Sequence, residues 1–221
     1  MAVKVFTLKL LLSRAYLVEL DGKTILVDAG IPGETRRILR GIKSAGYEKL
    51  DLIYITHAHI DHCGSAAAIR EITGAPIAVH EADSDALAVG ETRLGTGRGA
   101  GKVVKGIFPL IQKLWPTPPA PADVILEDGQ ELSDLGFVAS ILHTPGHTFG
   151  SSCLLVDDVA FVGDLLTTSG RNPRLQRYFA ESWSLLESSL ESLVAARPKI
   201  TYPGHGTKPI TLDELKRLLI Q

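Results

Sequence analysis

The sequence predicts an α+β protein in which two mixed β-sheets pack face to face and helices cover their outer sides. Two observations predict this arrangement. Strands, helices and further strands appear in two similar halves of the chain, and apolar residues make up 45% of it against 22% charged, as in ordinary globular proteins. The 221 residues can bury one sizeable core without a split, so we expect a single domain over residues 1–221.

The chain opens with strands joined by a tight turn. Strand-like patterns cover residues 5–12, 15–20 and 24–30. Asp21-Gly22, between the second and third of these, is a dipeptide typical of a β-hairpin. Residues 33–46 then have the apolar spacing of an amphipathic helix.

A strand–helix–strand unit follows. Residues 50–56 form a nearly continuous apolar run, typical of a strand buried on both faces, and residues 64–74 and 75–80 have the patterns of a helix and a further strand. Residues 81–122 differ because they hold many glycines and prolines and one apolar helical run, residues 102–115. We interpret residues 81–122 as a lid or an insertion, and the apolar run as a cover for the site or a dimer contact.

Strand patterns resume in the second half of the chain. They cover residues 123–132, 137–146, 151–164 and 199–206. Asp157-Asp158 is the expected turn of a hairpin within the third of these segments. Residues 180–197 and 211–220 have the period of amphipathic helices.

The stretch ITHAHIDHCG, residues 55–64, places three histidines and one aspartate at the end of a predicted strand. His57 and His59 are two residues apart, and in an extended chain this spacing puts both side chains on one side, where they can bind one ion. Asp61 and His62 follow as the chain turns into a helix, so they need not face the same ion. The layout therefore predicts two adjacent metal sites.

Three further candidates lie far along the chain, each at a predicted strand end beside a glycine or a turn. They are His147 in HTPGHTFG, Asp164 in FVGDLL and His205 in YPGHG. Loops at strand ends are where a rigid scaffold commonly carries its chemistry. Imidazole and carboxylate ligands without a thiolate suit Zn²⁺, Fe²⁺ or Mn²⁺.

The motif THAHIDHCG resembles the H-x-H-x-D-H signature of the metallo-β-lactamase superfamily, and the family's other motifs, VDAG, TPGH, GD and PGHG, appear in order. The resemblance covers almost the whole chain and implies an αββα sandwich. It also implies two metal sites: His57, His59 and His147 in the first, Asp61, His62 and His205 in the second, and Asp164 bridging both. Asp28, in VDAG, would orient a ligand histidine.

The resemblance further implies a reaction. Two divalent metal ions, Zn²⁺ first with Fe or Mn as alternatives, would hold a hydroxide between them and polarise the substrate. Asp61, which could pass a proton to the leaving group, and the bridging Asp164 are the expected catalytic residues. The class expected is a metal-dependent hydrolase.

Within the family, the chain is similar to glyoxalase II and to the acyl-homoserine lactonases, so the expected substrate is a thioester, a lactone or a related ester. It departs from both groups. Glyoxalase II usually ends its last motif with GHEYT, where this chain has GHGTKP. The lactonases usually carry a tyrosine shortly after the bridging aspartate, where this chain has LLTTSG.

Two alternatives of the same fold stay open. A persulfide dioxygenase would use one iron on His57, His147 and Asp164. A phosphodiesterase is favoured weakly by five basic residues, with no acid among them, between Thr92 and Lys113.

Other residues are expected around the site. Arg171 and Arg174 follow Asp164 closely and, together with Tyr178, would line the substrate rim. Cations there would attract an anionic small molecule. His143 lies four residues before His147 and would support a ligand histidine.

The remaining expectations concern partners and location. A formal net charge of −2 gives no reason to expect nucleic acid, and no apolar run reaches the ~20 residues that span a bilayer, so no membrane partner is expected. Two cysteines and the lack of an export cleavage site near the start favour the cytoplasm. A homodimer stays open.

Overall fold

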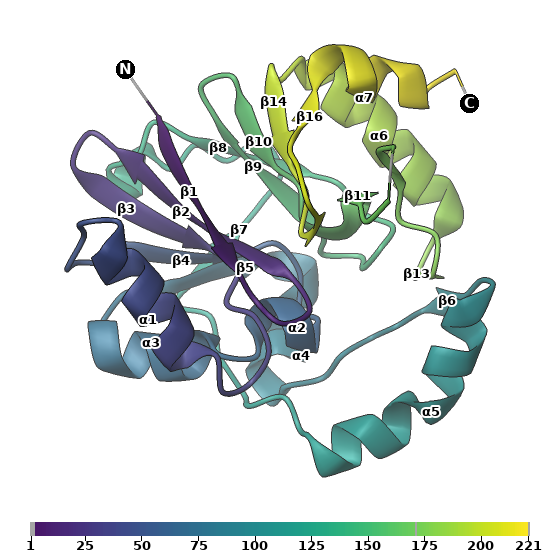
Figure 1. The fold of residues 1–221 in the computed structure, drawn as a ribbon, viewed down its shortest axis with the longest axis horizontal. Coiled ribbons are helices and arrows are strands. Elements are labelled where there is room, and N and C mark those ends of the chain that lie inside the picture. Colours follow the sequence, from purple (N-terminus) through teal and green to yellow (C-terminus); the bar gives the residue numbers. More distant parts are fainter. Residues whose placement is uncertain (1–2, 171, 221) are drawn as a thin grey trace.

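The computed structural model describes residues 3–170 and 172–220, and its centre is a pair of β-sheets (Figure 1). The first sheet has the strand order β1-β2-β3-β4-β5-β7. Its strands are β1 (Lys4–Lys9), β2 (Arg14–Leu20), β3 (Lys23–Val27), β4 (Leu52–Ile55), β5 (Ile77–His80) and β7 (Val124–Leu126). β2 is antiparallel to its neighbours β1 and β3, whereas β3, β4, β5 and β7 are parallel to one another.

The second sheet has the order β16-β14-β10-β9-β8. Its strands are β8 (Ser140–His143), β9 (Ser152–Val156), β10 (Val159–Phe161), β14 (Ile200–Tyr202) and β16 (Ile210–Thr211). β10 pairs in parallel with β14, and β8 runs in the same direction because both β8 and β10 are antiparallel to β9.

Two small sheets extend this framework beside the site. The first contains β11 (Leu166–Thr168), β12 (Arg174–Leu175) and β15 (His205–Gly206), and the second contains β6 (Thr96–Gly97) and β13 (Phe179–Ala180). The parallel pairing of β11 with β15 places the segment after Asp164 next to His205.

Helices cover both outer faces, as Figure 1 shows. On the first sheet lie α1 (Thr35–Ser44) and α3 (Ala66–Thr73), and on the second lie α6 (Trp183–Ala196) and α7 (Leu212–Leu218). Ile38, Ile69 and Leu190 are among the side chains that these helices bury. Between the sheets, Tyr54 of β4 and Phe161 of β10 belong to one continuous core. The order of layers is α, β, β, α, so the predicted fold class is confirmed.

Residues 81–122 contain two helices with different surroundings, α4 (Glu81–Val89) and α5 (Ala100–Leu114). Ala86 and Leu87 of α4 are buried in the core outside the first sheet, so α4 belongs to the body of the domain. The interpretation of residues 81–122 as a lid or an insertion stays a prediction, and the burial of α4 limits a lid to the part of this segment after α4. In α5, by contrast, Gly101 alone is buried, and Figure 1 shows the helix standing away from both sheets. No helix of the described residues combines the length and hydropathy needed to cross a bilayer.

Candidate metal centre

Parallel strands bring the predicted ligands to one edge of the sandwich. In the first sheet, Asp28 follows β3 and His57 follows its parallel neighbour β4. In the second sheet, His147, Asp164 and His205 follow β8, β10 and β14, which share one direction. The carboxyl ends of such strands meet at the same edge, so side chains distant in sequence converge there.

The first group of candidate ligands consists of His57, His59 and His147. Their ring nitrogens lie within 4.8 Å of one another. His59 Nδ1 and His147 Nε2 are 2.9 Å apart, and all three side chains are buried. The structure thus assembles the set that the sequence assigned to one ion.

The second group consists of Asp61, His62 and His205, whose candidate ligand atoms also lie within 4.8 Å of one another. His205 Nε2 is 3.2 Å from Asp61 Oδ2 and 3.4 Å from His62 Nε2. About a fifth of the Asp61 and His205 side chains is exposed, 21% and 22%. This group therefore faces the side of the centre from which solvent or a substrate can enter.

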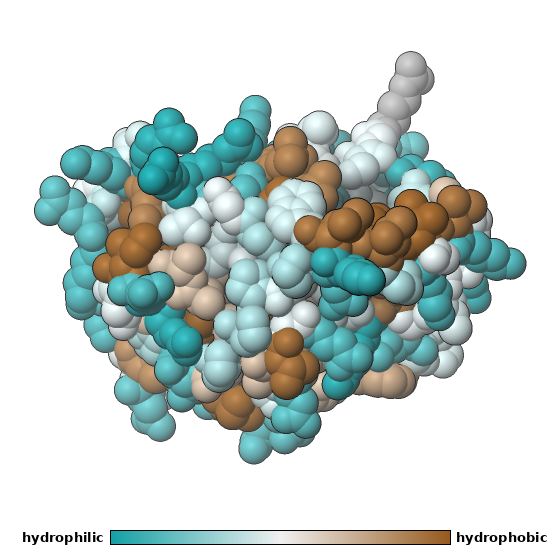
Figure 2. Space-filling model, turned by 90° about the horizontal axis from the view of Figure 1, so that it is seen from below, coloured by the Kyte–Doolittle hydropathy of each residue, from teal (hydrophilic) through white to brown (hydrophobic). Residues whose placement is uncertain are grey.

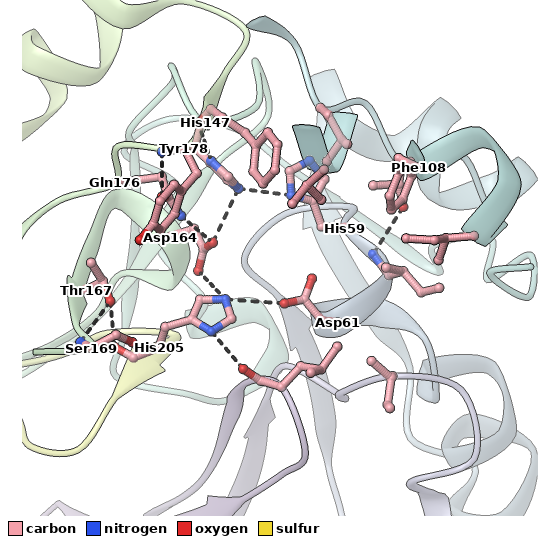
Figure 3. Close-up of a pocket in the computed structure, with 18 of the residues that line it drawn as sticks. His59, Asp61, Phe108, His147, Asp164, Thr167, Ser169, Gln176, Tyr178 and His205 are labelled. Carbon is pink, nitrogen blue, oxygen red and sulfur yellow. Dashed lines mark hydrogen bonds and ion pairs between the residues drawn. The ribbon is translucent and has the colours of Figure 1, made fainter. Parts of the chain in front are cut away.

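Asp164 lies between the two groups (Figure 3). Its Oδ2 is 3.5 Å from His147 Nε2, and its Oδ1 is 3.3 Å from His62 Nε2 and 3.2 Å from His205 Nε2. Gln176 Nε2 donates a hydrogen bond of 2.9 Å to Oδ2 and fixes the carboxylate. Asp164 can thus offer one oxygen to each group.

The histidine rings are held from behind by hydrogen bonds to acceptors of the protein. The outer nitrogens lie close to these acceptors: His62 Nδ1 to Asp28 Oδ2 (2.8 Å), His147 Nδ1 to Phe179 O (3.0 Å), His205 Nδ1 to Leu12 O (2.8 Å) and His59 Nε2 to Arg93 O (2.9 Å). Because the outer nitrogen donates its proton, the inner nitrogen can turn its lone pair to an ion. His59 alone presents Nδ1, since its Nε2 points to Arg93.

Charge divides the centre into two halves. Burial, together with the neighbouring histidines, lowers the pKa of His57 well below its ordinary value and that of His147 to about 3. Burial acts in the same direction on His62 and His205, but nearby carboxylates, Asp61 and Asp164 among them, outweigh it and raise both pKa values, that of His205 to about 10. His57 and His147 are therefore neutral at pH 7, whereas an ion that binds the second group must displace protons from His62 and His205.

The donor set fits divalent metal ions. Among the described residues, His57 Nε2 and Asp164 Oδ1 are buried polar atoms without a hydrogen-bond partner, an arrangement that costs about 1–3 kcal/mol per group when nothing compensates it. Both atoms belong to the histidine–aspartate cluster, where an ion would satisfy them. Imidazole nitrogens with carboxylate oxygens are ligands that Zn²⁺, Fe²⁺ and Mn²⁺ accept.

Two supporting residues escaped the sequence analysis. Gln176, which holds Asp164, lies in a stretch without any motif. Asp83 is buried on α4, and its carboxylate accepts hydrogen bonds from Ala58 N and Gly150 N. In the sequence it belongs to EADSDAL, which has the appearance of an ordinary charged helix face, so only the burial of α4 could have singled it out.

The centre opens into a cavity of about 390 Å³. Its walls are mainly apolar and include Leu12, Ile31, Ile60, Leu94, Val104, Phe108, Ile111, Trp115 and Phe179. His59, Asp61, His147, Asp164 and His205 lie at its floor, as Figure 3 shows. The ligands are thus accessible from a space large enough for a small molecule.

The residues expected at the rim have different positions. Arg174 and Tyr178 line the cavity, Arg174 Nη2 donates to Ser169 O at 2.6 Å, and Tyr178 Oη accepts from Arg177. Arg171 lies outside the described residues. His143, expected to support a ligand histidine, makes other contacts: its ring stacks on His80 at 3.9 Å and its Nε2 donates to Phe149 O.

Comparisons with known proteins agree with this geometry. The family model of the metallo-β-lactamase superfamily matches residues 8–205. The probable metallo-hydrolase YqgX of Bacillus subtilis (strain 168) is 30% identical over 205 residues, which cover 91% of this chain and 89% of YqgX.

Solved structures are similar over nearly the whole chain. TTHA1623 in a di-iron-bound form is 29% identical, with a TM-score of 0.71 and coverage of 97% of this chain and 98% of that one. The BLEG-1 B3 metallo-β-lactamase is 25% identical, with a TM-score of 0.71 and coverage of 96% and 95%. The family match includes every candidate ligand from His57 to His205. The chain therefore belongs to the metallo-β-lactamase superfamily.

Proposed function

We propose that this protein is a dinuclear metal-dependent hydrolase that acts on a thioester, a lactone or a related ester. One observation carries the proposal: two groups of ligand atoms share Asp164 and open into a single apolar cavity. The name of YqgX, a probable metallo-hydrolase, supports the same class of reaction.

Two ions would occupy the centre. The first would be held by His57, His59 and His147, the second by Asp61, His62 and His205, and both by Asp164. When bound, the ions would supply a Lewis acid and a hydroxide nucleophile at neutral pH. We propose Zn²⁺ as the native metal, and the di-iron form of TTHA1623 makes iron the first alternative.

Asp61 is placed to move a proton. Burial opposes its ionisation, but His62 and His205 outweigh burial and lower its pKa, so the carboxylate is charged at neutral pH. Its side chain is partly exposed and borders the cavity. It can accept a proton at Oδ2 from the nucleophile and return it to the leaving group.

The cavity walls favour a substrate with an apolar acyl portion. Phe108, Ile111 and Trp115 of the α5 segment face the cavity opposite the ligands. Among the described residues, Arg174 is the one arginine or lysine that lines it. A single cation is a weak basis for a phosphodiesterase, although it could pair with one anionic group of a small substrate.

The alternative function, a mononuclear-iron persulfide dioxygenase, would need fewer of the candidate ligands. It needs His57, His147 and Asp164, which leaves the complete second group without a role. We therefore give the hydrolase precedence.

Metal content and substrate class together test the proposal. Elemental analysis of protein from unsupplemented medium should give about two zinc, manganese or iron ions per chain. A panel of acyl thioesters, lactones and phosphodiesters should then show turnover of the first two classes. One iron per chain with oxygen consumption on a persulfide would contradict the hydrolase, and turnover of phosphodiesters alone would contradict the proposed substrate class.

Removing Arg174 separates the role of charge from that of the apolar wall. Arg174→Ala should raise KM for anionic esters and leave neutral esters unchanged. Arg36→Ala, an exposed arginine on α1, is the matched control. An equal effect of Arg174→Ala on both kinds of ester would exclude charge recognition at this position.

A further inference from the structure

Helix α5 has two apolar sides, and only one of them faces the cavity. Val104, Phe108, Ile111 and the adjoining Trp115 line the cavity. A second set with the same spacing is Val103, Ile107, Leu110 and Leu114, whose side chains are 69%, 51%, 60% and 77% exposed. At 3.6 residues per turn this second set forms one stripe along the helix, which we name the outer stripe.

The outer stripe has no cover among the residues that the structure describes. Figure 2, which views the face on which α5 lies, shows a row of hydrophobic side chains along that helix. On a monomeric protein, a contiguous row of exposed apolar side chains marks a surface that binds another protein or a membrane.

The charged residues of α5 are all basic. Lys102, Lys105 and Lys113 lie on the remaining side of α5. Residues 92–122 contain no aspartate or glutamate. An amphipathic helix with lysines on its polar side and large apolar residues on the other is the pattern of helices that lie in the interface of an anionic bilayer.

The apolar surface continues around the mouth of the cavity. Leu12, in the loop between β1 and β2, lines the cavity and is 55% exposed, and its neighbour Leu11 is also exposed. Exposed apolar side chains beside the cavity therefore come from two segments of the chain, one of them α5. A membrane or a protein that covers the outer stripe would lie next to the entrance of the cavity.

We propose that α5 attaches this protein to the surface of an anionic phospholipid bilayer, with the outer stripe in the interface and the lysines at the headgroups. This attachment differs from spanning a bilayer, for which no helix in the described part of the chain is long and apolar enough. It also replaces the expectation of no membrane partner, which rested on the lack of a spanning segment.

A second copy of the chain fits the outer stripe less well. In a two-fold dimer the same patch meets itself, so the three lysines of one α5 would approach those of the other. With no acid in residues 92–122, these charges would lack partners across that contact. An anionic lipid surface supplies the missing counter-charge.

Vesicle sedimentation of the metal-loaded protein tests the proposal. We expect binding to vesicles containing phosphatidylglycerol, weaker binding at high salt, and little binding to pure phosphatidylcholine. Leu110→Glu should weaken binding at least tenfold, while Ile72→Glu, at an exposed position on α3, should leave it unchanged. Lys102→Gln with Lys113→Gln keeps the outer stripe and should remove the preference for the anionic lipid.

The outcomes are independent of the proposed hydrolase activity because binding needs no turnover. Circular dichroism of each variant checks that the helix content of the wild type is retained. Absence of vesicle binding, or equal binding of the wild type and Leu110→Glu, overturns the proposal. So does light scattering that shows a dimer which Leu110→Glu converts to a monomer, because the outer stripe would then cover a second copy.

Discussion

The carboxylate of Asp83 accepts a hydrogen bond of 2.8 Å from the backbone N–H of Ala58, the residue between the two ligand histidines of the first loop. The same oxygen, Oδ2, accepts from Thr148 Oγ1 at 2.8 Å, and Oδ1 accepts from Gly150 N at 3.0 Å. Thr148 directly follows His147. One side chain of α4 thus connects the two loops that supply the first ligand group.

Replacing Asp83 with asparagine should loosen that group. The amide keeps the shape of the carboxylate but turns an NH₂ toward hydrogen-bond donors, so at least one of the three bonds is lost. Residues that support metal ligands typically contribute 10–100-fold to affinity, and we expect a loss of about that size for the ion of the first ligand group. Competition with a chromophoric chelator measures it.

Asp85→Asn is the control for this experiment. Asp85 lies on the same helix but is exposed, so its substitution changes the charge equally and breaks no contact to the ligand loops. If Asp83→Asn binds the metal with wild-type affinity, the two ligand loops hold their positions without the carboxylate.

Gly204→Ala should disturb the second ligand group. A Cβ at this position would lie 2.6 Å from His62 Cε1 and 2.9 Å from Asp164 Oδ1, so both ligands must shift. We expect about one ion per chain in place of two by elemental analysis, with a circular dichroism spectrum like that of the wild type. Gly106→Ala, where a Cβ meets nothing within 4 Å, should keep the full metal content.

Removing the metal should destabilise the fold. A ligand that binds only the native state adds about 2.7 kcal/mol at a free concentration 100 times Kd. The free energy of unfolding should therefore rise with free Zn²⁺ and fall when a chelator is added. If the urea concentration at the unfolding midpoint is the same with and without Zn²⁺, Mn²⁺ or Fe²⁺, the metal centre is contradicted.

His80 should make the protein less stable in mild acid. Burial first, and the stacked His143 second, lower the pKa of His80 in the folded state. Below about pH 6.5, His80 is therefore protonated in the unfolded chain but still neutral in the native state. The stabilisation that neutral His80 provides is complete above that pH and is lost as the pH falls toward the pKa of His80 in the folded state.

His80→Asn isolates this effect. His80 Nδ1 accepts the N–H of Ala82 at the start of α4, and asparagine can cap a helix in the same way without titrating. The free energy of unfolding of the variant should therefore fall less steeply than that of the wild type between about pH 7 and pH 5. Parallel slopes would show that His80 titrates alike in both states.

The candidate ligand set could be proposed from the sequence because its pattern is local. Four candidate ligands fall within six positions of one loop, and His147, Asp164 and His205 each stand beside a glycine or a turn at a strand end. Spacing says nothing about where a side chain points when its partner is distant in sequence. His143 was therefore assigned to the centre although its ring stacks on His80.

Asp83 escaped prediction for a related reason. Its partners are backbone N–H groups and one hydroxyl from other elements, and backbone donors leave no trace in the sequence. Likewise α4, with Ala86 and Leu87 as its buried contacts, is too short for its pattern to separate it from the segment that follows.

The ligands of each group come from both halves of the sandwich. His57 and His59 follow a strand of the first sheet, whereas His147 follows a strand of the second, and the same division separates His62 from His205. Each ion would therefore act as a cross-link that holds the two sheets together at one edge of the domain. Metal supply would then govern how long the folded chain resists proteases as well as whether it turns over substrate.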